Sequence, residues 1–274
     1  MMPIVDPHVG LSRDEFPLDD YLTQSDEFHV LRMVAVQQPQ LIDSTIDNLH
    51  YYRDMSTTRG YGGFPNGVVA YCNLAEADSL DKLFSDDSSS VVRGVHYAPS
   101  QNQQTGEPIR SSTQTEPLLW TKKLEMLSSK EMSLDLTLSI DECDLINAIV
   151  KSHSDIRIMV TLQNWAQWLE TKNTSLFKKQ IELLAQCDNI NIKLCDSAFG
   201  TNSSYKSIQK LMINRCANRF GYDRIMFASS FSSSGGASMS MDQQWASYVK
   251  ATDKFTAIQR DKVFRSNAIR LYRL

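Results

Sequence analysis

The chain has 274 residues and a formal net charge of −4 at pH 7. Hydrophobic residues make up 42% of it and charged residues 22%, so it has enough apolar side chains for a large core, and composition excludes a disordered, collagen-like or coiled-coil chain. Binding to nucleic acid or to an anionic membrane requires clustered lysine and arginine, and this slightly acidic chain gives no such footprint. We therefore expect neither partner.

Cysteine usage and the N-terminal sequence both bear on the cellular compartment. The five cysteines are widely spaced and form no Cys-x-x-Cys pair, so neither a disulfide framework nor a zinc knuckle is indicated. The first residues, Met-Met-Pro-Ile-Val-Asp, contain no basic segment, and no stretch approaches the roughly 18 apolar residues that a membrane span requires. These features predict a cytoplasmic protein without a targeting or anchoring segment.

Short apolar runs alternate along the chain with longer amphipathic stretches, a pattern typical of strands joined by crossover helices. The predicted strands are residues 3–6, 30–36, 67–71, 91–95, 133–138, 156–161, 190–194 and 224–228. The clearest helical stretches are residues 41–55, 143–152, 176–187 and 205–220. About eight strands close a parallel barrel, so we predict a (β/α)8 TIM barrel that forms a single domain over residues 1–274.

Two polar segments follow predicted strands. Residues 98–118 are rich in Gln, Ser and Thr and are expected to form an extended loop after the fourth strand. Residues 229–240 are rich in serine and follow the eighth strand, where barrel enzymes build their sites.

Several blocks of sequence, taken in chain order, resemble one known group of proteins. The blocks are Asp6-Pro7-His8, Val34-Ala35-Val36-Gln37, Gly67 to Leu74, Arg93-Gly94-Val95-His96, Asn189 to Leu194, Phe220 to Phe227 and Phe264 to Tyr272. In order and spacing they resemble the amidohydrolase-related barrel hydrolases (amidohydrolase 2), and among these the lactonase-like branch. The resemblance spans almost the whole chain and implies the same TIM barrel.

The sequence differs from this family at the positions that the resemblance assigns to catalytic chemistry. The resemblance implies a metal-binding or water-activating cluster of two histidines on the first strand, a histidine ending a middle strand and an aspartate ending the eighth. In this chain those positions hold His8, Gly10, a segment without histidine at 160–164, and Ser230. One imidazole does not replace the three or four protein ligands that zinc needs. We therefore expect no family-type metal site and no cofactor.

The candidate catalytic residues lie on two strands. His8 is suited to act as a general base or to bind a carboxylate, and Asp6 orients His8, caps a loop or helps to close the barrel floor. Lys193 interrupts an apolar strand, where a charge is costly unless it is paired. Asp196, just beyond that strand, is its expected partner, in a pair that activates water or serves as a plain ion pair.

Four further residues are candidates for substrate binding. We expect Gln37 to point into the barrel mouth and to offer its amide to a ligand. Arg93 and His96 flank a glycine at the end of the fourth strand, and the resemblance implies a substrate-contacting arginine at position 96. Ser230 occupies the position of the family's aspartate and retains only a hydroxyl.

Two functions of different classes remain open on this sequence. The first is a lactonase-like hydrolase that acts on a small carboxylated or sugar-acid lactone or ester without a family-type metal site. The second is a catalytically inactive descendant that binds a small ligand or a protein partner at the barrel mouth. Retention of the scaffold does not decide between them, because a fold does not settle a function. The sequence also leaves the substrate and the oligomeric state open.

Overall fold

The computed structural model describes residues 2–11, 18–25, 28–98, 117–138, 142–151, 153–162, 174–195, 203–232 and 240–274. The predicted loop at 98–118 lies mostly outside these residues, as does most of the serine-rich segment at 229–240.

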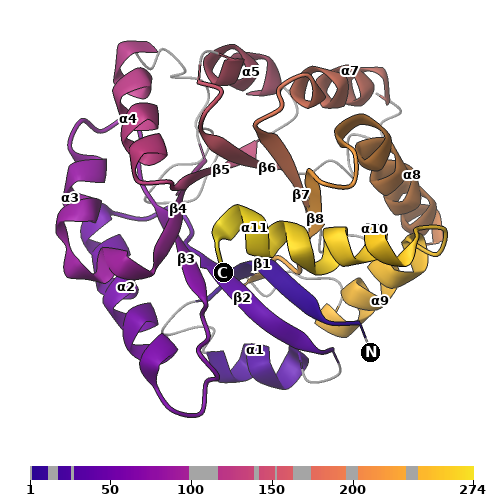
Figure 1. Ribbon diagram of the computed structural model, residues 1–274, viewed down its shortest axis with the longest axis horizontal. Helices are drawn as coiled ribbons and strands as arrows, with labels where there is room; N and C mark the ends of the chain where they lie inside the picture. The colour runs from indigo at the N-terminus through magenta and orange to yellow at the C-terminus, as the bar shows by residue number, and fades with distance from the viewer. Residues whose placement is uncertain are drawn as a thin grey trace.

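Strands and helices alternate along the described chain (Figure 1). The strands are β1 (Ile4–Gly10), β2 (Val30–Val36), β3 (Gly67–Tyr71), β4 (Val92–Tyr97), β5 (Ser133–Leu138), β6 (Arg157–Leu162), β7 (Ile190–Leu194), β8 (Ile225–Phe227) and β9 (Phe231–Ser232). The helices are α1 (Leu18–Ser25), α2 (Ile42–Thr57), α3 (Ser79–Ser85), η1 (Asp87–Val91), α4 (Pro117–Ser129), α5 (Cys143–Lys151), α7 (Thr174–Ala185), α8 (Ser203–Phe220), α9 (Met241–Ala251), α10 (Ala257–Asp261), η4 (Lys262–Ser266) and α11 (Asn267–Tyr272).

All the strands belong to one parallel sheet, in the order β8-β7-β6-β5-β4-β3-β2-β1-β9. The short strand β9 follows β8 in the chain and pairs with β1 on the other edge, so the sheet curls into a barrel with helices around it (Figure 1). The eight predicted strands and the TIM barrel are thus confirmed. We call the C-terminal ends of the strands the mouth and the N-terminal ends the floor.

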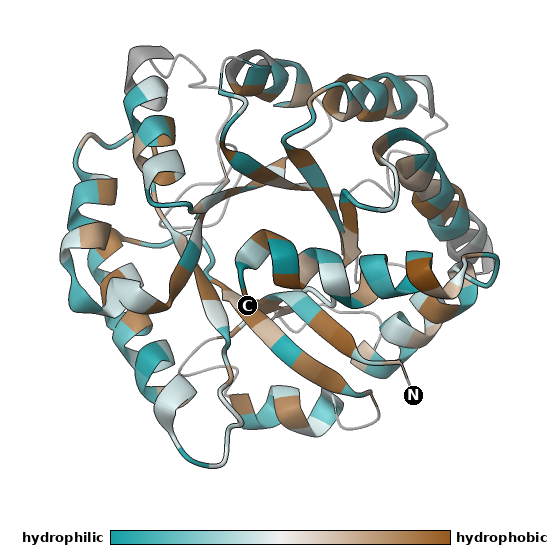
Figure 2. Ribbon diagram, in the orientation of Figure 1, coloured by the Kyte–Doolittle hydropathy of each residue, from teal (hydrophilic) through white to brown (hydrophobic). Residues whose placement is uncertain are grey.

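The strands are more apolar than the helices around them, as Figure 2 shows by its colours. On α7, Phe177, Ile181 and Leu184 lie on one stripe at helical spacing and are buried against the sheet. Within the described residues, no helix is long and apolar enough to cross a membrane.

Two short helical elements and a helical turn close the floor. α10, η4 and α11 cross the near end of the barrel in Figure 1. Asn267 donates through Nδ2 to the carbonyl oxygens of Tyr222 and Ile225, both at 2.7 Å, which fixes α11 beneath β8. Leu271 and Tyr272 then pack inside the barrel against Val5 and other apolar residues of the strands. The C-terminal helix is therefore a plug in the floor.

The seam between β8 and β1 is held by the buried side chain of Asp6. Its Oδ1 accepts hydrogen bonds from the backbone amides of Ser229, at 3.0 Å, and His8, at 3.3 Å. Its Oδ2 accepts from the Tyr21 hydroxyl of α1 at 3.1 Å. Asp6 thus joins both edges of the sheet to the first helix.

This seam makes the stability of the protein depend on pH. Burial raises the pKa of Asp6 from 3.8 to about 6, although the hydrogen bonds from Ser229, His8 and Tyr21 lower it. The native state therefore binds the proton more tightly than the unfolded state. The stabilising contribution is complete below about pH 3.8 and is lost as the pH rises through about 6.

We predict that the free energy of unfolding of the wild type, measured relative to that of Asp6→Asn, falls by about 2–3 kcal/mol between about pH 4 and pH 7. Urea unfolding at a series of pH values measures this difference. Asp20→Asn, at an exposed position of the neighbouring helix, controls for the general effect of removing a carboxylate. A difference between wild type and Asp6→Asn that does not change with pH would contradict the prediction.

Candidate functional site

A row of polar side chains crosses the inner wall of the barrel towards the mouth. Thr137 of β5, Thr161 of β6 and Lys193 of β7 are partners in register on adjacent strands. Because residues in register point to the same face of a sheet, the three side chains lie side by side. All three are buried. The hydroxyl oxygen of Thr161 has no hydrogen-bond partner among the described residues, so it is free to bind a ligand.

His96, near the end of β4, is held by two hydrogen bonds. Its Nδ1 lies 2.7 Å from the carbonyl oxygen of Gln37, and its Nε2 lies 2.8 Å from Oγ1 of Thr137. A carbonyl oxygen only accepts, so Nδ1 carries the proton and Nε2 accepts from the Thr137 hydroxyl. Burial lowers the pKa of His96 to about 4, and the hydrogen bond to Gln37 only partly opposes this. His96 is therefore neutral at pH 7 with both nitrogens engaged.

His8, near the end of β1, differs from His96 in having a ring nitrogen without a hydrogen-bond partner among the described residues. Its side chain is 6% exposed, and its Nδ1 is buried without a hydrogen-bond partner among the described residues. Burial lowers the pKa of His8 well below its ordinary value, and the nearby Lys193 and His96 lower it further. His8 is thus a neutral imidazole at pH 7, and its unprotonated nitrogen is available to take a proton.

A buried ion pair lies below this row. Nζ of Lys193 is 2.7 Å from Oδ2 of Asp135, and each side chain is 1% exposed. The Tyr272 hydroxyl of α11 donates to the same Oδ2 at 2.5 Å, and the Ser133 hydroxyl donates to Oδ1 at 2.9 Å. Ser133 has room there because position 94 is glycine: a Cβ at Gly94 would lie 2.0 Å from its Oγ. The charge of Lys193 is therefore balanced inside the barrel.

The partner of Lys193 differs from the one expected from sequence. Asp196 lies outside the described residues, and the carboxylate paired with Lys193 is that of Asp135, 58 residues earlier in the chain. The hydrogen bond joins β5 to β7 across the intervening β6, which is possible because both side chains point into the barrel. Asp135, Thr137, Thr161 and Tyr272 are the residues of this region that the sequence reasoning did not single out.

Gln37 does not offer its amide to the mouth, which corrects the expectation for this residue. Its Nε2 donates to the carbonyl oxygen of Thr45 at 3.1 Å, and its Oε1 accepts from the amide of Tyr71 at 3.0 Å. The side chain therefore fastens β2 to α2 and β3. Gln37 reaches the site through its backbone oxygen, which orients His96.

Arg93 also lies away from the mouth. β4 runs from Val92 to Tyr97, so Arg93 begins the strand and His96 lies near its end. The Arg93 guanidinium donates to the carbonyl oxygens of Ser90 and Val92, both at 3.1 Å. The sequence-based strand ended two residues too early, and this placed Arg93 at the wrong end of the barrel.

Ser230 follows β8 at the mouth and is partly buried. Its φ of 50° lies in the left-handed region, which is uncommon for a residue other than glycine and turns the chain between β8 and β9. Asp6 lies at the same seam, where it holds backbone amides. It therefore does not orient the ring of His8.

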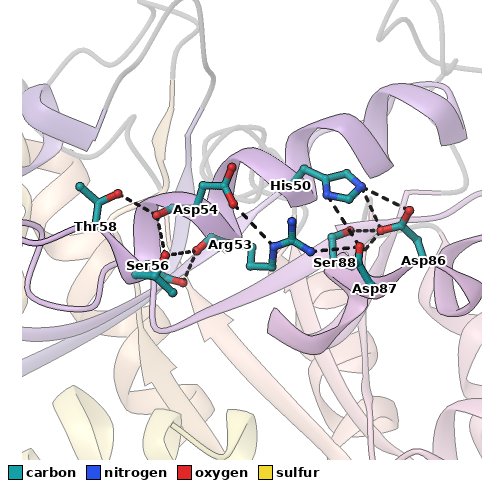
Figure 3. A network of polar contacts seen from close by, with 9 residues as sticks. His50, Arg53, Asp54, Ser56, Thr58, Asp86, Asp87 and Ser88 are labelled. Atoms are coloured by element: carbon teal, nitrogen blue, oxygen red, sulfur yellow. Dashed lines mark hydrogen bonds and ion pairs between the residues drawn. The ribbon is translucent and has the colours of Figure 1, made fainter.

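A second polar cluster lies on the outer surface and contains the only group of potential metal ligands among the described residues (Figure 3). Nε2 of His50 is 3.1 Å from Asp86, and its Nδ1 is 3.9 Å from Asp87. The guanidinium of Arg53, one turn further along α2, is 3.0 Å from Asp87. Because Arg53 already supplies a cation, this cluster is a clamp between α2 and η1.

The fold resembles that of known proteins of solved structure. No family model matches the chain. An amidohydrolase from Burkholderia multivorans with bound zinc has a TM-score of 0.80 at 15% identity, and each chain is covered over 100% of its length. A putative 2-pyrone-4,6-dicarboxylic acid hydrolase from Pseudomonas putida has a TM-score of 0.69 at 14% identity, with 98% of this chain and 97% of that chain covered.

A relative is also found by sequence. The uncharacterized protein y4mH of Sinorhizobium fredii is 26% identical over 221 residues, which are 77% of this chain and 71% of that protein. The structural matches extend over essentially the whole chain, so the chain shares the TIM-barrel fold of these proteins.

Among the described residues, the donor set of the barrel interior does not fit a zinc ion of the kind that the Burkholderia protein holds. All five histidines are among the described residues, and only His8 and His96 lie inside the barrel. Both nitrogens of His96 are engaged, which leaves one free imidazole. The inward residue of β6 nearest the mouth is Thr161, and Ser230 follows β8. These groups fall short of the three or four nitrogen, sulfur or carboxylate ligands of a zinc site.

We predict that purified protein exposed to zinc retains well under one equivalent per chain after dialysis. Elemental analysis of wild type and of His50→Ala measures this, because His50→Ala removes the surface cluster and reports any ion that binds there. One equivalent of zinc that survives in His50→Ala but is lost in His8→Asn would overturn this conclusion.

Proposed function

We propose that the chain is a hydrolase of amidohydrolase type that opens a small carboxylated or sugar-acid lactone or ester at the mouth, without a family-type zinc site. The observation that carries this proposal is His8. It is a neutral, buried imidazole whose Nδ1 has no hydrogen-bond partner among the described residues, and it lies near the positive charge of Lys193. A buried polar group left unpaired is costly, and it is expected where a ligand will pair with it.

The proposed reaction needs one base and an electrophilic carbonyl. His8 takes a proton from water as the water oxygen attacks the carbonyl carbon of the lactone. The oxyanion then faces the charge of Lys193 and the unpartnered hydroxyl of Thr161. When the tetrahedral intermediate collapses, the ring C–O bond breaks and protonated His8 returns the proton to the leaving oxygen. The product is the open hydroxy acid.

The names of the structural relatives agree with this class of reaction. One is called a putative 2-pyrone-4,6-dicarboxylic acid hydrolase, and the Burkholderia amidohydrolase has been crystallised with zinc and with HEPES. A lactone or ester carbonyl is more electrophilic than an amide, so it depends less on activation by a metal. These points support a hydrolase and a small organic ligand, and they leave the substrate to experiment.

A second candidate is the inactive descendant that binds a small ligand or a protein partner at the mouth. The observation that favours it is the loss of reactive groups. Ser230 stands at the position of the family aspartate, and both His96 and Lys193 are engaged within the protein. Under this alternative, His8 and Thr161 bind a ligand and no water is activated.

An assay of chelator-treated protein separates the two candidates. Neutral sugar-acid lactones and carboxylated lactones are supplied in turn, and ring opening is followed by the acid that it releases. The hydrolase proposal expects turnover that is unaffected by the chelator. Turnover that appears only with added zinc contradicts the metal-free reaction. A lactone that raises the melting temperature but is never opened favours the binding protein.

A further inference from the structure

The C-terminal helix reaches the site through the barrel interior. Tyr272 of α11 enters from the floor, and its hydroxyl donates to Asp135 at 2.5 Å. The same carboxylate oxygen accepts from Nζ of Lys193 at 2.7 Å, and Nζ lies 5.9 Å from the centroid of the Tyr272 ring. The three residues are each at most 2% exposed, so water does not compete for these contacts.

We propose that Tyr272 and Asp135 are positioning residues that hold the ammonium of Lys193 where it faces the oxyanion of the substrate. This inference rests on the proposed hydrolase function. Through Tyr272, the helix that plugs the floor contributes to a site at the opposite end of the barrel.

The position of the Lys193 charge depends on the groups that hold its side chain. Lysine carries its charge on a flexible four-carbon chain, so its ammonium is placed only as well as its partners fix it. Lys193 is level with Thr137 and Thr161, whereas Asp135 lies one inward position closer to the floor. The ion pair therefore fixes the ammonium at one place, between the polar row of the site above it and the plug below it.

The carboxylate that holds the ammonium is itself held. A buried ion pair is stable only when further hydrogen bonds satisfy its remaining lone pairs. Tyr272 and Ser133 supply these bonds, one to each carboxylate oxygen. Burial, and then the charge of Asp135, raise the pKa of Tyr272 well above its ordinary value, so the phenol stays protonated and keeps donating.

Tyr272→Phe tests the proposal because it removes one hydroxyl and keeps the ring that packs in the floor. The matched control is Tyr52→Phe. Tyr52 is 1% exposed, and its hydroxyl donates to the carbonyl oxygen of Leu11 at 2.6 Å, without contact with Asp135 or Lys193. Each variant thus loses one buried hydroxyl with one hydrogen bond.

Two readouts go beyond stability. The first is the ¹H–¹⁵N signal of the Lys193 ammonium, assigned by its disappearance in Lys193→Met; in wild type, a buried and firmly held ammonium exchanges slowly and gives a sharp signal. The second is the separation of kcat from KM. We expect Tyr272→Phe to shift or broaden the ammonium signal and to lower kcat about 10-fold to 100-fold at an almost unchanged KM, the scale of a small misplacement of a reacting group. Tyr52→Phe should change neither.

The proposal is overturned if Tyr272→Phe leaves the ammonium signal and kcat as in wild type, or if Tyr52→Phe changes them equally. Ser133→Ala, which removes the donor to the other oxygen of Asp135, provides a milder variant should Tyr272→Phe not fold. The same shift of the signal is expected from it, and an unchanged signal counts against the proposal. If no lactone is turned over, the hydrolase function fails, and the ammonium signal still decides whether Tyr272 holds Lys193.

Discussion

Replacing Asp135 by asparagine will lower the free energy of unfolding by about 3–5 kcal/mol, the cost of leaving one charge of a buried pair without its partner. The Lys193 ammonium would then face an amide group in a place where both side chains are 1% exposed. The Tyr272 and Ser133 hydroxyls would also face a neutral amide in place of an ionised carboxylate. Urea unfolding at pH 7 measures the effect.

A double-mutant cycle separates the pair from the general cost of altering the core. Lys193→Met alone leaves Asp135 buried without its cation and is also expected to be strongly destabilising. In the double variant neither charge remains, so its loss should be clearly smaller than the sum of the two single losses, with a coupling of about 1–3 kcal/mol. Strictly additive losses would show that the two residues do not act as a pair.

The barrel was predictable because its strands carry a strong local signal. Runs such as Val30–Val36 and Gly67–Tyr71 are short, rich in valine and bounded by turn-forming or helical sequence, and they form β2 and β3 with the expected bounds. Once eight such strands alternate with helices, few topologies remain. The closing strand β9 was not expected, since its two residues carry no pattern and depend on pairing with β1.

The ion pair also has a signal in the sequence. In β5 the buried leucines alternate with Ser133, Asp135 and Thr137, and in β7 Asn191 and Lys193 alternate with isoleucine and leucine. A period of two places these polar residues on one face, which in a barrel is the inner one. Applied to both strands, this rule places Asp135 and Lys193 in the same interior, whereas closeness in sequence pointed to Asp196.

Other parts of the site depend on contacts that no local pattern contains. Tyr272 reaches Asp135 across 137 residues, because the C-terminal helix docks in the floor of the closed barrel. Gln37 and His96 are 59 residues apart, and their bond uses a backbone oxygen whose direction the side chain does not reveal. A backbone acceptor and a terminal helix contribute to the site through tertiary structure alone.

Exchanging His8 for asparagine will reduce turnover of a lactone substrate by about 10²-fold or more, the scale of losing a general base. Folding should change little, because the Nδ1 atom of His8 makes no hydrogen bond with any described residue. The lowered pKa of His8 also predicts the pH profile. The free base persists below the ordinary histidine pKa of 6.5, so kcat/KM should stay level through that pH and fall only in more acidic solution.

His96→Asn is the matched control, since it removes the second imidazole of the barrel interior. His96 has hydrogen bonds on both nitrogens, so its loss should lower the melting temperature, whereas His8→Asn should lower kcat in a protein of nearly wild-type stability. Steady-state kinetics and thermal unfolding of the two variants make the comparison. If His8→Asn turns over substrate at the wild-type rate, His8 is not the base, and the chemistry must be sought at Lys193 and Asp196.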